Sequence, residues 1–182
     1  MANKANTTKV VTGIVRLSYE HVWEPVAVND SKPKYSVSLI IPKTDTKTIN
    51  AINAAVENAI KDGVAKFGGK IPPRGALKLP LRDGDLERED EAYTGSYFVN
   101  ANSTTAPQIV DRAVQPILDR SEVYSGCYAR VSVNFYAFNT NGNKGIACGL
   151  GNIQKIRDGE PLGSRTSAAD DFATDPDDDF LD

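Results

Sequence analysis

The chain has few of the residues on which most enzyme and metal sites depend. Its 182 residues include one histidine, two cysteines and one tryptophan. The single histidine, His21, has no cysteine or histidine companion at metal-ligand spacing, and one histidine leaves little room for general acid–base catalysis. A Ser-His-Asp set, a Walker loop and a dinucleotide-binding glycine fingerprint are also missing. We therefore expect no catalysis and no metal site, with His21 at the surface or hydrogen-bonded to a neighbouring loop.

Long apolar runs are missing as well. No stretch approaches the roughly 18 apolar residues that a membrane-spanning helix needs, and the polar residues 1–8 lack the apolar centre of a signal peptide. We therefore expect a cytoplasmic protein that does not contact membranes. Cys127 and Cys148 lie in apolar, strand-like stretches, so we interpret them as reduced core residues, with a disulfide between them as the alternative.

Acidic residues are concentrated at one end of the chain. The last thirteen residues, Asp170–Asp182, contain seven aspartates and no base, whereas the whole chain has 24 acidic and 21 basic side chains. Residues 1–169 therefore have 17 acids and 21 bases, a net charge of +4. Such a tail must be solvated, and a basic body beside it suggests binding to a polyanion, most often nucleic acid. A tail that serves only solubility is the alternative.

The hydrophobic pattern predicts strands around one long helix. β-rich residues 10–19 and period-two alternation over 35–41 predict the first two strands. Apolar side chains at three- and four-residue steps predict an amphipathic helix over 46–67, capped by Thr44 or Asp45 and stopped by the following Gly-Gly pair. The later segments are an edge strand at 77–81, a charged loop at 82–92, a short strand at 97–102 and mostly irregular chain at 107–118.

The clearest hairpin signal comes from two strand-like runs, 128–138 and 144–156, that flank a polar loop with an Asn-Gly step. Alternation along the first run separates a core face from an opposite face. The core face has Val131, Val133, Phe135 and Ala137, and the opposite face has Arg130, Ser132, Asn134, Tyr136 and Phe138. The opposite face suits single-stranded nucleic acid, because unstacked bases lie on aromatic rings and basic side chains neutralise phosphates. Alternatively, either ring packs beneath the helix or a loop.

A second candidate patch opens the chain. It comprises Arg16, Tyr19, His21 and Trp23, and the segment Lys32-Pro33-Lys34-Tyr35 follows it. The Trp23 indole, at the predicted end of a strand, could stack on a base or cap the core. Tyr35 shares the alternation of the apolar face, so a core position is open for this ring too.

The charged loop invites an enzymatic alternative. Clustered carboxylates hold the ions of magnesium-dependent nucleases, and Asp83 and Asp85 could share a cation. The spacing begins like a calcium-binding loop, but the glycine and the closing glutamate of that motif are out of place. We favour a solvated loop and keep a metal-dependent nuclease as the alternative.

Five blocks of sequence occur in a fixed order that spans most of residues 8–160. They are Val-Thr-Gly-Ile-Val-Arg-Leu-Ser-Tyr (11–19), Tyr-Ser-Val-Ser-Leu-Ile-Ile-Pro-Lys (35–43), Leu-Arg-Asp-Gly-Asp (81–85), Tyr-Ser-Gly-Cys-Tyr-Ala-Arg (124–130) and Gly-Asn-Lys-Gly-Ile (142–146). Together they resemble a bacteriophage and prophage family of single-stranded DNA-binding proteins. The resemblance implies a mainly β fold, an OB-fold barrel with one long inserted helix, that binds single-stranded DNA without marked sequence preference during phage replication or recombination. It implies no cofactor, no catalysis, and a location in the cytoplasm of a bacterial host.

The resemblance also implies roles for the acidic tail. Acidic ends tipped by a hydrophobic pair are similar to those of bacterial and phage single-stranded DNA-binding proteins, in which the tip docks replication and repair partners and can occupy the DNA groove. The residues that match are Asp177, Asp178, Asp179, Phe180 and Leu181. The ending Phe-Leu-Asp differs from the usual bacterial Pro-Phe, so the partner could be a phage protein rather than the host's usual tail receptors.

We therefore predict an OB-fold domain over residues 1–160 and a disordered acidic tail over 161–182. The predicted DNA-binding residues are Arg16, Tyr19, Trp23, Lys34, Tyr35, Arg130, Tyr136, Phe138 and Lys144. The basic residues would contact phosphates. The rings expected to stack on bases are Trp23, Tyr35, Tyr136 and Phe138. The expected partners are single-stranded DNA and, through the tail, replication or recombination proteins, with a homo-oligomer left open. A phage structural protein with an acidic scaffold-binding tail is the third hypothesis.

Overall fold

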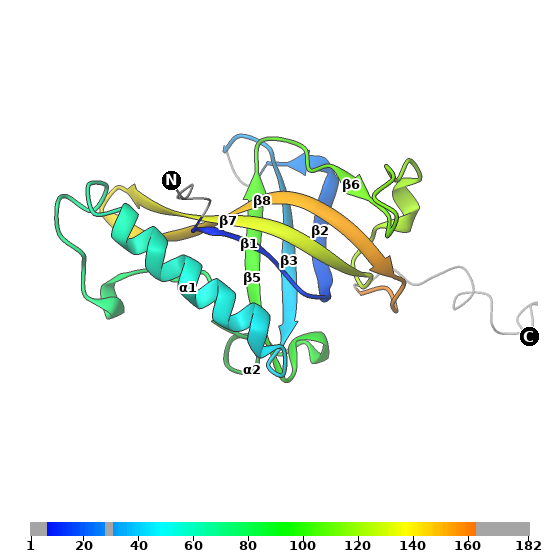
Figure 1. Cartoon of the computed structure of the whole chain (residues 1–182), viewed down its shortest axis with the longest axis horizontal. Helices are drawn as coiled ribbons and strands as arrows, with labels where there is room; N and C mark the ends of the chain where they lie inside the picture. The colour runs from blue at the N-terminus through cyan, green and yellow to red at the C-terminus, as the bar shows by residue number, and fades with distance from the viewer. Residues whose placement is uncertain (1–6, 28–30, 163–182) are drawn as a thin grey trace, which may run out of the picture.

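The described chain contains more β-strand than helix. This computed structural model describes residues 7–27 and 31–162, so residues 163–182 of the predicted tail lie outside them. Residues 161 and 162, also predicted to belong to the tail, are described, and the Leu162 N–H donates to the Ser125 carbonyl at 2.8 Å. The elements in chain order are β1 (Lys9–Val11), β2 (Val15–Val26), β3 (Lys34–Pro42), α1 (Thr46–Asp62), β4 (Arg82–Asp83), α2 (Gly84–Glu87), β5 (Ser96–Ser103), β6 (Ile109–Val110), β7 (Tyr128–Thr140) and β8 (Asn143–Arg157). Figure 1 shows β7 and β1 crossing in front of β3 and β5, with α1 below them. Within the described residues, no helix is both long and apolar enough to cross a membrane.

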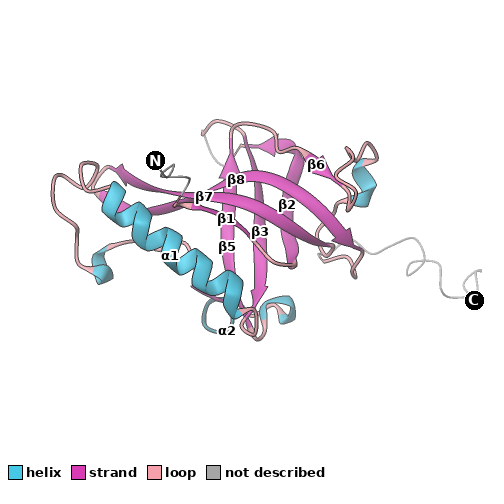
Figure 2. Cartoon of the chain, in the orientation of Figure 1, coloured by secondary structure: helices cyan, strands magenta, loops and turns pink. Residues whose placement is uncertain are grey.

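Five strands close into a barrel. β2 pairs antiparallel with β3, and β3 pairs antiparallel with β5. β5 pairs parallel with β8, which is antiparallel to β7, and β7 returns to pair with β2. A five-stranded Greek-key barrel of this kind is an OB-fold, and the secondary-structure colouring of Figure 2 shows one long helix outside it. The predicted fold class, a mainly β barrel with one inserted helix, is confirmed.

The predicted hairpin forms the longest strand pair, and β7 and β8 extend beyond the barrel as an arm. Asn141 and Gly142 at its tip have φ angles of 52° and 86°, the positive values that a two-residue primed turn requires. The register aligns Tyr136 with Ala147 and Asn134 with Gly149. Alternation along β7 confirms the predicted faces, because the four predicted core side chains are buried and the opposite set is exposed or half-buried.

Helix α1 begins where its sequence predicts and ends earlier. The Asp45 carboxylate caps it by accepting a hydrogen bond from the Thr48 N–H at 3.2 Å. The helix ends at Asp62, and the Gly63 N–H bonds back to the carbonyl of Ala59. A Cβ at position 63 would overlap that of Ala137 on β7, so glycine permits the close approach of helix and strand. The prediction that the helix runs to residue 67 is therefore wrong, although Phe67 is still buried in the turns that follow.

Other strand boundaries differ from the predicted ones. The strand predicted over 10–19 is two strands, separated by Thr12–Ile14, and β2 continues through Trp23 to Val26. The edge strand predicted over 77–81 is reduced to one bridge between Lys78 and Gly145. Both cysteines are buried and free, as expected of reduced core residues.

A small second core lies outside the barrel. Ile40 and Phe98 face each other across β3 and β5 on the outer side of the sheet, and both are buried. Tyr93, from the segment between α2 and β5, covers them and is fully buried. The predicted charged loop is therefore an ordered segment packed on the outer face of the barrel.

Candidate nucleic-acid interface

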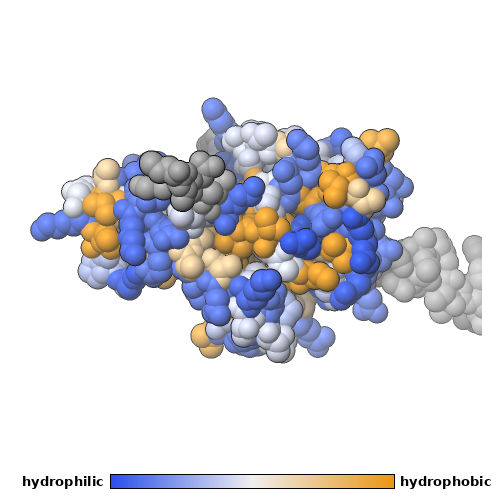
Figure 3. All heavy atoms as spheres, viewed as in Figure 1, coloured by the Kyte–Doolittle hydropathy of each residue, from blue (hydrophilic) through white to orange (hydrophobic). Residues whose placement is uncertain are grey.

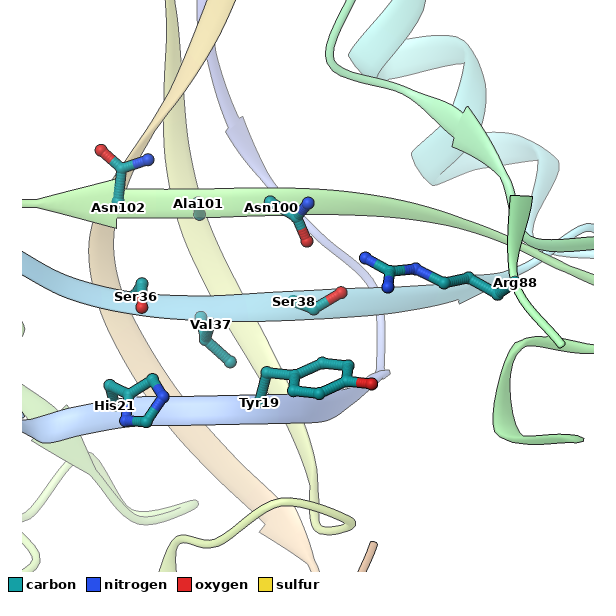
Figure 4. A pocket seen from close by; sticks show the side chains of 9 residues that line it. All are labelled: Tyr19, His21, Ser36, Val37, Ser38, Arg88, Asn100, Ala101 and Asn102. Carbon is teal, nitrogen blue, oxygen red and sulfur yellow. The ribbon is translucent and has the colours of Figure 1, made fainter. Parts of the chain in front are cut away.

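An open groove of about 340 Å³ lies on the outer face of three neighbouring barrel strands. Its lining residues are Tyr19 and His21 from β2, Ser36, Val37 and Ser38 from β3, Asn100, Ala101 and Asn102 from β5, and Arg88 from the segment before β5. Figure 4 shows these side chains spread across the three strands.

The floor of the groove is polar and uncharged. Ser36 lies opposite Asn102, and Ser38 opposite Asn100, in the register of β3 and β5. The intervening Ala101 is buried, because successive side chains point to opposite faces of a strand. Ser38 is buried and bonded to the Tyr93 hydroxyl, whereas Ser36, Asn100 and Asn102 are exposed or half-buried. The hydroxyl and amide groups of these three residues both donate and accept hydrogen bonds, so they can bind base edges of either polarity.

One end of the groove combines an exposed ring with a cation. Tyr19 is 57% exposed and has a φ of 47° within a bulge of β2. The Arg88 guanidinium carbon lies 4.9 Å from the ring centroid of Phe98, 5.4 Å from that of Tyr93 and 5.7 Å from that of Tyr19. In Figure 4 Arg88 reaches along β3 toward Ser38, with Tyr19 on the adjacent strand. A base could stack on the exposed tyrosine within reach of a positive charge.

The segment that carries Arg88 is rich in acidic residues, some of which form ion pairs with other cations. Lys43 Nζ lies 2.9 Å from carboxylate oxygens of both Asp83 and Asp85, and Arg82 pairs with Glu87. Within residues 7–27 and 31–162, no carboxylate lies at ion-pair distance from Arg88. Its charge is therefore available to an external anion.

The same contacts argue against the predicted metal alternative. Asp83 and Asp85 share Lys43 rather than facing an open space. The Asp83 carboxylate also accepts the Asp85 N–H and so caps α2. Among the described residues, no group of three or more metal-ligating side chains comes together.

Several predicted DNA contacts have partners inside the protein. Arg16 donates to the carbonyl oxygens of Gly126, at 3.1 Å, and Glu160, at 2.7 Å. Lys144 donates to the Phe67 carbonyl at 3.1 Å. The exposed Arg130 donates to the Thr12 carbonyl at 3.2 Å. These bonds fix the cations in place without cancelling their charge.

Two predicted stacking rings pack against the core. The Trp23 indole is half-buried and donates to the Val123 carbonyl at 3.0 Å. Tyr35 is likewise half-buried against the barrel core. The sequence allowed either a stacking or a core position for Trp23 and Tyr35, and in the structure both rings pack against the core. In contrast, Lys34 is exposed at the start of β3.

The two aromatic residues of the arm lie on the outward-facing side of β7. Tyr136 is 43% exposed, and a Cβ at Gly149 would lie 3.5 Å from its ring. Gly149 pairs with Asn102 of the groove across β5 and β8. Phe138 is half-buried further along the arm. β8 thus connects a strand of the groove to the arm.

Of the groove residues, the sequence pointed only to Tyr19 and His21. It did not point to Ser36, Val37, Ser38, Arg88, Asn100, Ala101 and Asn102. The asparagines alternate along a predicted strand, as Ser36 and Ser38 do, and this polar alternation was the available signal. Arg88 gave no such signal, because an arginine in an acid-rich loop is typical of a solvated surface.

A family model covers almost the whole chain. The model described as "Enterobacter phage Enc34, ssDNA-binding protein" matches residues 8–181. The chain belongs to this family. Its members are phage single-stranded DNA-binding proteins rather than enzymes, which excludes the nuclease alternative. The match includes the predicted partner-binding residues 177–181, which lie outside the described residues.

Similar proteins and solved structures are consistent with this family membership. Protein p50 of Acyrthosiphon pisum secondary endosymbiont phage 1 is 30% identical over 174 residues, 90% of this chain and 92% of that protein. The single-stranded DNA-binding protein from bacteriophage Enc34, in complex with ssDNA, matches with a TM-score of 0.77 at 23% identity, over 89% of this chain and 97% of that chain. The single-stranded DNA-binding protein gp2.5 of bacteriophage T7 matches with a TM-score of 0.60 at 16% identity, over 91% of this chain and 92% of that one. The two structures establish a shared fold.

Proposed function

We propose that the chain coats single-stranded DNA during phage replication or recombination, with the strand lying across the groove of β2, β3 and β5 and onto the β7–β8 arm. The observation that carries the proposal is Arg88, a cation without a carboxylate partner in the described residues, held beside the exposed Tyr19 ring. OB-folds bind oligonucleotides on the face of their second and third barrel strands and on two flanking loops. Here those strands are β3 and β5, and the loops are the β2–β3 connection and the tip of the arm.

The chemistry of the groove supports binding without marked sequence preference. Stacking on Tyr19 and Tyr136 is open to every base and contributes about 1–3 kcal/mol per base. The side chains of Ser36, Asn100 and Asn102 on the floor both donate and accept, so no base is excluded. A duplex hides its base faces in the stack, and we therefore expect the single strand to bind more tightly.

Replacement of the Arg88 charge tests this placement. We expect Arg88→Gln to weaken binding of a labelled single-stranded oligonucleotide about tenfold, the loss of one charge-assisted contact. The slope of log K against log salt should fall by about 0.7, the value for one phosphate on a single strand. Arg112→Gln is the matched control, because Arg112 is an exposed arginine outside the groove. Equal affinities of the two variants would place the DNA elsewhere.

We further propose that the acidic tail docks replication or recombination proteins and modulates DNA binding. Its seven aspartates lower the net charge from +4 for residues 1–169 to −3 for the whole chain. A tail of that charge competes with phosphate for basic side chains. Binding of single-stranded and duplex oligonucleotides by the full chain and by residues 1–169, over a salt series, tests the competition. Truncation should tighten binding most at low salt, and an unchanged or weaker affinity would remove the modulating role.

A further inference from the structure

The segment that carries Arg88, residues 84–95, is fixed on the outer face of the barrel by close packing. The Tyr93 and Phe98 rings meet edge to face at a centroid distance of 5.2 Å. The Tyr93 hydroxyl donates to the Ser38 hydroxyl at 3.0 Å, and both side chains are buried. A Cβ at Gly84 would lie 2.5 Å from the Tyr93 carbonyl oxygen, so the start of the segment lies directly against its end.

The two ends of this segment are joined through Asp85. Its carboxylate accepts the Gly95 N–H at 2.9 Å and contacts Lys43 Nζ at 2.9 Å. Lys43 also contacts Asp83 at 2.9 Å, and its Nζ lies 5.1 Å from the Tyr97 ring. Since Lys43 directly follows β3, one ammonium group ties that strand to the start of the segment, and Asp85 ties the start to the end.

Lys43 and Asp85 are both charged at neutral pH. The Gly95 N–H and then the Lys43 ammonium lower the pKa of the Asp85 carboxyl. The carboxylates of Asp83 and Asp85 in turn raise the pKa of Lys43 above its ordinary value. Neither Lys43 nor Asp85 lines the groove, so neither is placed to touch the DNA.

We propose that Lys43 and Asp85 are positioning residues for DNA binding, which hold residues 84–95 so that the Arg88 guanidinium stays over the groove. This inference rests on the proposed function, because it assigns the pair a role in the same site. The pair acts on the DNA only through Arg88. Loss of either partner loosens the segment and lowers the contribution of Arg88 to affinity.

Two substitutions separate positioning from simple electrostatics, because they change the net charge in opposite directions. Asp85→Asn removes a negative charge, so long-range electrostatics alone would tighten DNA binding. Lys43→Met removes a positive charge, so electrostatics alone would weaken it. Positioning requires both variants to bind more weakly. Asp158→Asn is the matched control, because Asp158 is an exposed aspartate paired with a lysine, Lys155, at 2.6 Å and lies outside the groove.

The experiment measures dissociation constants of the full chain for a fluorescein-labelled oligothymidylate by anisotropy, at a temperature where circular dichroism shows every variant folded. We expect Asp85→Asn and Lys43→Met each to bind about three- to tenfold more weakly, part of the loss from Arg88→Gln. Asp158→Asn should bind as tightly as the unaltered chain or slightly more tightly. In the Arg88→Gln background, either substitution should change the affinity by less than about twofold, because the positioned group is already absent.

The outcomes distinguish this inference from the proposed function. Opposite effects of Asp85→Asn and Lys43→Met, or losses that multiply fully with that of Arg88→Gln, would overturn the positioning role and leave the DNA site in place. No effect of Arg88→Gln itself would instead overturn the placement of the site. Weaker binding by both variants that disappears in the Arg88→Gln background supports the inference.

Discussion

The strained backbone of Tyr19 predicts that its side chain contributes to DNA affinity and adds little to the stability of the fold. Its φ of 47° lies in the left-handed region, which costs a residue with a Cβ about 1–2 kcal/mol. The ring returns little of this cost through burial, because 57% of the residue is exposed. Asparagine adopts this conformation more readily. We therefore expect Tyr19→Asn to change the free energy of unfolding by less than about 1 kcal/mol, as relief of strain offsets the lost ring contacts.

The same substitution should weaken DNA binding strongly. Loss of one base–aromatic stack of about 1–3 kcal/mol corresponds to about a 5- to 150-fold higher dissociation constant. Urea denaturation and anisotropy with a single-stranded oligonucleotide measure the two effects on the same protein. Tyr19→Phe is the control, because it keeps both the ring and the strained backbone and should bind within about twofold of the unaltered chain. A destabilisation above about 2 kcal/mol with unchanged affinity would show that the ring serves packing instead.

Three further predictions concern the fold. Tyr93→Phe and Ser38→Ala should each lower the free energy of unfolding, measured by urea denaturation, by about 1–3 kcal/mol. The double substitution should lower it by less than the sum, because no buried hydroxyl is then left unpaired. Additive losses would contradict the hydrogen bond between the two residues. Gly63→Ala should destabilise the chain by about 1–3 kcal/mol, because its Cβ would overlap that of Ala137, whereas Gly75→Ala, with nothing within 4 Å, should not. Burial raises the pKa of both cysteine thiols, so a disulfide-exchange reagent at pH 8 should label them only after unfolding, and rapid labelling of the folded chain would contradict their burial.

Local patterns were sufficient to predict most of the barrel. The Asn-Gly turn and the alternation along β7 depend on neighbouring residues, and both are present as predicted. The end of α1 was predicted wrongly because an apolar period continues to Phe67, while Gly63 packs against a strand more than seventy residues away. The continuation of β2 past Trp23 likewise depends on pairing with β3, ending at Val26 opposite Lys34. These boundaries depend on contacts between residues distant in sequence, which a local pattern cannot predict.

The candidate site was harder to predict than the fold. Residue type indicated which side chains can contact DNA. It did not indicate which of them form hydrogen bonds within the protein instead. Trp23 donates to a carbonyl one hundred residues away, and Lys144 to one 77 residues away. Conversely, the case for Arg88 depends on the structure, in which Asp83, Asp85 and Glu87 pair with Lys43 and Arg82 rather than with Arg88.

The partners of the cations divide them into two groups. Lys43 contacts Asp83 and Asp85, and Arg82 contacts Glu87, so these two cations add little to the positive potential. Arg16 and Lys144 instead donate to main-chain carbonyls, which hold them rigidly but carry no formal charge. A cation held by a carbonyl still attracts phosphate, whereas one held by a carboxylate largely does not. The described structure thus separates cations that stabilise the fold from cations that remain available to a nucleic-acid backbone, and Arg88 belongs to the second group.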